Sequence, residues 1–184
     1  MTRSSADGAC VLMAAAAALL ATGQAGAKIP TPTKVEDVSR VLKAKADATP
    51  KELSAAGSDP DAVLAELVGD TRADLELRVR AARALGGYPG QRARGVLTAA
   101  MTSRQYPEEI RVAAMTGLAR AFKEVVLDEL QPYVKDASPG LRAGAARALG
   151  VLGGARARAL LLSAIESEEV IEVRAAMEEA LKKL

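Results

Sequence analysis

A ten-residue motif occurs twice in this chain and constrains the fold more than any other feature. Residues 77–86 (LRVRAARALG) and 141–150 (LRAGAARALG) match at eight of ten positions. If the repeat period is half of the separation between these two copies, a further copy should lie midway between them. Residues 110–118 (IRVAAMTGL) lie there. A fourth copy follows at residues 173–181 (VRAAMEEAL). A period of about 32 residues predicts a repeat architecture in which each unit stacks on its neighbours.

Each copy predicts an α-helix, which we call the first helix of its repeat. The reason is that Ala and Leu are the strongest helix formers and the chain has almost no aromatic residues to build a sheet. Second helices are predicted between the copies, where apolar residues recur at helical spacing. These residues are Val96, Leu97, Ala100 and Met101, then Val126, Leu127, Leu130 and Val134, then Leu161, Leu162 and Ile165. The expected fold class is all-α: an α-α superhelix of about four stacked helical hairpins.

One arginine and one leucine recur at fixed places in the copies. The arginines are Arg78, Arg111, Arg142 and Arg174, and the leucines are Leu85, Leu118, Leu149 and Leu181. We predict structural roles for both sets, the arginines as struts between repeats and the leucines as filling between layers. Paired alanines in each copy, up to Ala175 and Ala176, are predicted to let neighbouring backbones approach closely.

Glycine and proline punctuate the repeats. Gly86 and the Gly153-Gly154 pair follow first helices and are predicted to end them, since glycine accepts the left-handed conformation of a helix end. Pro107 and Pro139 are predicted to open the next first helices, because proline is tolerated in a first turn.

The x-Arg-x-x-Ala-Ala-x-x-Leu-Gly pattern resembles the short HEAT repeat, of the phycobilin-lyase-like subtype, across residues 60–184. The resemblance implies a ladder of ion pairs between each repeat arginine and an acidic residue. The acidic candidates are Asp70 or Asp74, Glu108 or Glu109, Asp136, and Glu169 or Glu172. Only Asp70 and Asp136 stand where the family pattern places the acid.

Residues 28–59 are less regular and are predicted to form a lead-in and a degenerate N-terminal cap for the repeat domain at 60–184. Thr33 and Thr49 each stand three residues before a glutamate, Glu36 and Glu52, which predicts two capping boxes at helix starts.

Residues 1–27 are interpreted as a signal peptide. The apolar run at residues 11–21 (VLMAAAAALLA) is too short to span a bilayer as a helix, which needs about 20 residues. Ala25-Gly26-Ala27 fits the small-x-small pattern of a cleavage site, so cleavage is predicted between Ala27 and Lys28. Because Cys10 precedes the run, a lipid anchor is not expected. The alternative is an Ala-rich helix of the fold. We expect an exported protein, periplasmic or secreted.

The chain has no histidine, and its single cysteine lies in the predicted leader. A mature chain would thus lack the usual general base, the thiol nucleophile and the commonest zinc ligands. We predict no catalytic residue, no metal site and no cofactor. The net charge of +2 is too small to indicate a nucleic-acid partner.

Three functions remain open. The first is a non-catalytic protein-protein interaction or scaffold module of the cell envelope or extracellular space, with a partner and an oligomeric state that the sequence leaves open. The second is an enzyme or accessory of the HEAT-like lyase or glycosylase type, although the chain has no aromatic cluster to hold a chromophore or a base. The third is a weak binder of anionic polymers or membrane surfaces.

The predicted partner-binding residues are two basic pairs that begin second helices: Arg92 and Arg94, and Arg156 and Arg158. The two pairs have the same separation as the two copies of the ten-residue motif and are therefore equivalent positions in the repeat. A solvated surface without a partner is the alternative for these arginines.

Overall fold

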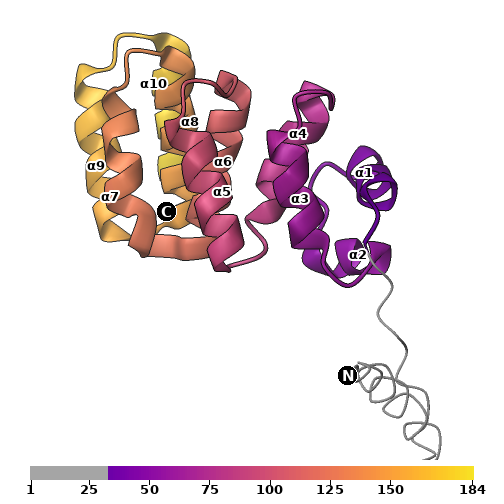
Figure 1. Cartoon of the computed structure of the whole chain (residues 1–184). Coiled ribbons are helices and arrows are strands. Elements are labelled where there is room, and N and C mark those ends of the chain that lie inside the picture. Colours follow the sequence, from indigo (N-terminus) through magenta and orange to yellow (C-terminus); the bar gives the residue numbers. More distant parts are fainter. Residues whose placement is uncertain (1–32) are drawn as a thin grey trace, which may run out of the picture. The chain divides into compact units, whose positions relative to one another are not determined.

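The computed structural model describes residues 33–184, and this part of the chain consists of helices and their connections (Figure 1). The α-helices are α1 (Val35–Ala44), α2 (Pro50–Leu53), α3 (Pro60–Gly69), α4 (Leu75–Leu85), α5 (Gln91–Thr102), α6 (Glu108–Phe122), α7 (Leu127–Leu130), α8 (Pro139–Leu152), α9 (Gly154–Ser167) and α10 (Ile171–Leu181). No strand occurs among these residues. The predicted all-α fold is confirmed.

The helices pack as successive antiparallel pairs. Each second helix packs most closely on the first helix that follows it: α3 on α4, α5 on α6, the α7 segment on α8, and α9 on α10. The first helices α4, α6, α8 and α10 also contact one another in order along the chain. The structure therefore confirms a stack of helical pairs, joined through a continuous layer of first helices.

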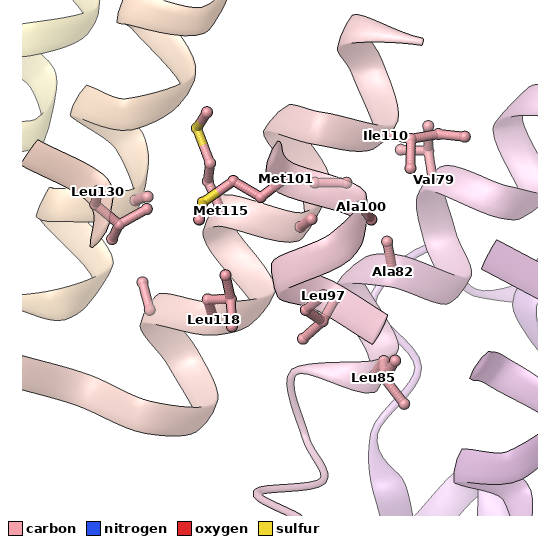
Figure 2. Packing of buried hydrophobic residues seen from close by; sticks show 14 of the residues in the cluster. Val79, Ala82, Leu85, Leu97, Ala100, Met101, Ile110, Met115, Leu118 and Leu130 are labelled. Carbon is pink, nitrogen blue, oxygen red and sulfur yellow. The ribbon is translucent and has the colours of Figure 1, made fainter. Parts of the chain in front are cut away.

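The repeated leucines form the core between the pairs. Leu85, Leu118 and Leu149 are fully buried, and Figure 2 shows the first two on either side of Leu97 from α5. Leu181 in α10 is only half-buried. Ala175 in the same helix is exposed, so the predicted close packing of the paired alanines does not extend to it.

Gly86 is needed for the close approach of α4 and α6 and not for an unusual backbone conformation. Its φ of −62° is right-handed, so the predicted left-handed helix end is wrong at this position. A β-carbon on Gly86 would lie 2.7 Å from the Cα of Gly117 in α6, which explains why the side chain is absent. The left-handed prediction is right at Gly153 and Gly154, whose φ values are 82° and 86°.

The second helix that lies between α6 and α8 is irregular, although the apolar spacing of residues 126–134 predicted a regular one. The short α7 lies between two 3-10 segments, η3 (Lys123–Val126) and η4 (Gln131–Lys135). Lys123 begins the irregular stretch with a φ of 53°, which is unfavourable for a residue with a β-carbon. Pro132 lies in η4 and lacks the backbone N–H that a longer α-helix would need.

The two predicted capping boxes differ in outcome. At α2 the box is confirmed: the Thr49 N–H donates to Glu52 Oε2 at 2.8 Å, and the Glu52 N–H donates back to Thr49 Oγ1. At α1 the box is wrong, because Lys34 is the N-cap residue and no side chain caps the helix. Thr33 Oγ1 instead accepts a hydrogen bond from the Asp59 N–H at 2.8 Å and ties the start of α1 to the start of α3.

The predicted leader and the cleavage position at Ala27 and Lys28 lie outside the described residues. Within residues 33–184, every helix is too short or too polar to cross a membrane.

Candidate partner-binding surfaces

Ion pairs join neighbouring second helices. The charges that the helices contribute to these pairs alternate along the stack, acidic on α3 and α7 and basic on α5 and α9. Arg92 at the start of α5 donates from Nη1 to Asp59 at 3.0 Å and to Asp61 at 2.7 Å, both at the start of α3. Arg94, further along α5, pairs with Glu129 of α7. The Arg94 guanidinium also lies over the Phe122 ring, with 5.3 Å between Cζ and the ring centroid.

The other predicted basic pair continues this alternation in part. Arg156 at the start of α9 donates to Asp128 of α7 at 2.7 Å. Arg158 is exposed and makes no hydrogen bond or ion pair with the described residues. Three of the four predicted partner-binding arginines thus contact acidic residues of a neighbouring second helix. Their role toward a partner stays a prediction.

The four repeat arginines share a different kind of contact, with backbone carbonyls just before their own helix. Arg78 donates to Val68 O from Nε and Nη2, both at 3.2 Å, and Arg111 Nε donates to Met101 O at 3.1 Å. Carbonyls at a helix C-terminus lack partners in their own helix and carry the negative end of the helix dipole, so a guanidinium stabilises them. These arginines therefore join each second helix to the first helix that follows.

The last two repeat arginines also bind backbone carbonyls that precede their own helix, but these carbonyls lie about one turn closer to the arginine along the chain. Arg142 Nη1 donates to Asp136 O at 2.9 Å, and Arg174 Nε donates to Glu168 O at 3.2 Å. Both acceptors lie in the turn between a second helix and the next first helix.

The ladder of ion pairs implied by the family resemblance has one rung in the described residues, and its acid is none of the predicted candidates. Arg142 donates from Nε to Glu168 Oε2 at 2.7 Å and from Nη2 to Glu168 Oε1 at 2.9 Å. Asp70 instead pairs with Arg72 at 3.0 Å, and Asp136 accepts the Ser138 N–H at 2.9 Å.

The buried setting of this rung shifts the proton affinity of Glu168. Its side chain is 5% exposed, and its Oε1 also accepts the Val170 N–H at 3.0 Å. The hydrogen bonds from Arg142 hold the pKa of Glu168 below its ordinary value, against the opposing effect of burial. The same pair raises the pKa of Arg142. Both groups therefore stay charged, and the pair joins α8 to the turn between α9 and α10.

Tyrosines take the place of the acid at the two earlier repeats. The guanidinium of Arg78 lies 6.0 Å from the Tyr106 ring centroid, and that of Arg111 lies 6.0 Å from the centroid of Tyr133. An arginine over an aromatic face is attracted by the ring quadrupole. The Tyr133 hydroxyl also donates to Met101 O, the carbonyl that Arg111 binds.

An open groove of about 550 Å³ crosses the first helices α4, α6 and α8, and we name it the first-helix groove. It is lined by Leu75, Glu76, Val79, Arg83, Glu108, Glu109, Val112, Gly140 and Arg147. Leu75 is 41% exposed, which is unusual for a leucine in a first helix of this chain. Gly140 lets the Glu108 carboxylate lie against the backbone of α8, where a β-carbon would collide with it. The groove combines apolar side chains with charges of both signs.

Two arginines of this groove were not predicted as site residues. Arg83 and Arg147 occupy the same position in the two copies of the ten-residue motif. Neither makes a hydrogen bond or ion pair with the described residues, and Arg147 is exposed. The signal was present in the sequence: a second arginine recurs in the motif although the packing of the helices does not require it.

A second groove of about 570 Å³ lies between the irregular α7 segment and α9. Pro132, Val134 and Leu160 provide its apolar part, and Asp128 and Lys135 lie among its other lining residues. Among residues 33–184 no group of three or more His, Cys, Asp or Glu side chains is arranged to hold a metal ion.

Residues 103–182 match the family of HEAT repeats. This segment is therefore similar to HEAT repeats. The match includes α6 to α10, whereas α3 to α5 lie before it although they pack in the same pairwise way. A comparison with curated proteins gave no match. Within this matched segment, the arginine of each first helix binds the preceding carbonyls as described above.

Proposed function

We propose that this chain is a non-catalytic protein-binding module that is exported from the cytoplasm and acts in the cell envelope or outside the cell. HEAT repeats commonly mediate protein-protein interactions, because a stack of helices presents an extended surface to a partner. The leader-like residues 1–27 support export, and the short HEAT subtype named above is part of the same proposal.

The first-helix groove is the observation that carries this proposal. Arg92, Arg94 and Arg156 on the second helices are neutralised by acidic partners. In contrast, Arg83, Arg147 and Glu109 around the groove make no hydrogen bond or ion pair with the described residues. Exposed apolar side chains beside unpaired charges are typical of a recognition surface, where the apolar part gives affinity and the charges give specificity.

The groove also indicates the chemistry of its partner. Leu75 and Val112 would contact an apolar stripe, and Arg83 and Arg147 would pair with carboxylates. A protein segment with apolar residues flanked by Asp or Glu meets these requirements. A uniformly anionic polymer fits less well, because Glu76, Glu108 and Glu109 line the same groove.

The experiment is an affinity capture from envelope and culture fractions with three forms of the tagged chain. The wild type and a matched control, Arg104→Glu with Arg120→Glu, are expected to retain the same protein, since both control arginines are exposed and away from the groove. The groove variant, Arg83→Glu with Arg147→Glu, is expected to lose it. Equal recovery by all three forms, or recovery of polysaccharide, lipid or nucleic acid alone, would contradict the proposal.

Export is tested separately by the mass of the chain after expression in its own cell type. The expected product begins at Lys28 and is found outside the cytoplasm. The change Ala27→Arg places a large charged residue at the predicted cleavage position and should leave the leader attached. An unprocessed wild type confined to the cytoplasm would overturn the export part of the proposal.

A further inference from the structure

One stripe of α9 faces away from the core and carries an apolar residue between two opposite charges. Arg158, Leu162 and Glu166 follow one another at intervals of four residues and therefore share one side of the helix. All three are exposed, and the Leu162 side chain keeps 51% of its accessible surface. The two charged residues make no hydrogen bond or ion pair with the described residues.

The arginine two repeats before Arg158 shows which contact this position makes when another second helix packs beside it. Arg94 occupies the same place in its repeat as Arg158 and pairs with a carboxylate, Glu129, from a neighbouring second helix. The position is therefore suited to a carboxylate presented by a second helix packed alongside. Arg158 lacks such a carboxylate in the described residues, and a helix that offers one would complete its contacts.

The α9 stripe itself offers the matching helix. In an antiparallel pair of α9 helices related by a two-fold axis at Leu162, the two leucines meet at the centre. Arg158 of each copy then faces Glu166 of the other, because each lies four residues, about 6 Å along the helix, from the axis. The exposed alanines Ala155 and Ala159 leave room for helices to approach through rows of residues four apart.

We propose that two copies of this chain associate through α9, antiparallel, with Leu162 at the two-fold axis and two reciprocal Arg158–Glu166 ion pairs. The surface is self-complementary, as a two-fold interface requires. It is also small, since one helix of 14 residues provides most of it. The expected association is therefore weak, with a dissociation constant on the order of 10⁻⁴ M.

Charge reversal tests this arrangement by sedimentation velocity of the full chain over a wide concentration range. The wild type is expected to sediment faster as its concentration rises. Arg158→Glu and Glu166→Arg are each expected to remain monomeric, because each places two pairs of like charges in contact. An equimolar mixture of the two variants should associate again, since every pair then joins opposite charges.

A variant of the same charge change elsewhere is the control. Arg120→Glu alters an exposed arginine of α6 and should associate like the wild type. Thermal melts followed by circular dichroism check that all variants fold, which is expected because the altered side chains lie on the surface. A wild type that stays monomeric throughout would overturn the proposal. Single variants that associate as well as the wild type, or a mixture that does not, would overturn it too.

Discussion

Arg142 and Glu168 form a two-point ion pair that joins α8 to the turn between α9 and α10, with N–O distances of 2.7 and 2.9 Å. The arginine side chain is 16% exposed and the glutamate 5%, so solvent screens the pair little. Removing one partner leaves the other charge buried without compensation, which is the costly way to break such a pair.

Glu168→Gln is expected to lower the free energy of unfolding by about 2 kcal/mol at neutral pH. Because folding lowers the pKa of Glu168, its contribution is fully present above the unfolded value of about 4.3 and is lost as the pH falls through the folded value. The difference between wild type and variant should therefore shrink under acidic conditions. Urea unfolding from neutral pH to pH 3 measures it.

Glu169→Gln provides the matched control, because this neighbouring glutamate is exposed. It should change the unfolding free energy little at any pH. An equal loss for both variants would mean that the pair with Arg142 is not the source of the stability.

The capping box of α2 gives a second, separate pH dependence. Glu52 accepts hydrogen bonds from Lys45 Nζ at 2.6 Å and from Thr49, which lower its pKa to about 2. Its contribution to stability is present above the unfolded value of about 4.3 and lost as the pH falls toward 2. Glu52→Gln should lower the melting temperature at pH 6 and make a much smaller difference at pH 2, as measured by circular dichroism. A melting temperature that is unchanged at pH 6 would contradict this.

Lys123→Gly is expected to stabilise the chain by about 1 kcal/mol. Lys123 has a φ of 53° and an exposed side chain, so glycine relieves backbone strain at little loss of contact. The control is Arg120→Gly, three residues earlier in α6, where the right-handed helix makes glycine unfavourable by about 1 kcal/mol. Chemical denaturation compares the two, and a loss of stability in both would show that Lys123 is not strained.

Gly117→Ala should destabilise the chain by about 2 kcal/mol. Its β-carbon would lie 2.8 Å from Ala82 O and 3.1 Å from Leu97 Cδ1, and the backbone oxygen cannot move independently of α4. Gly95→Ala in α5 is the opposite case, because a β-carbon there meets no atom within 4 Å. That change should stabilise the helix by about 0.5–1 kcal/mol. Differential scanning calorimetry of both variants measures the contrast, and similar effects would refute the close approach.

The sequence by itself determined the kind of fold and the register of its repeats. Leu85, Leu118 and Leu149 could be placed in the core because the side of a helix that a residue faces follows from its spacing along the chain. The Thr49 box was predictable for the same reason, since donor and acceptor lie three residues apart. The predicted leader at residues 1–27 depends on local composition and stays a prediction.

Only the tertiary structure decided which charges meet. Glu168 reaches Arg142 from 26 residues away, and Asp128 reaches Arg156 from 28, so these pairs depend on the offset between stacked helices rather than on local spacing. Thr33 binds the start of α3 instead of capping its own helix for the same reason. A repeat period fixes which faces are buried, because burial depends on periodicity. It does not fix which long, flexible side chains meet, because that depends on how far each helix is shifted along its neighbour.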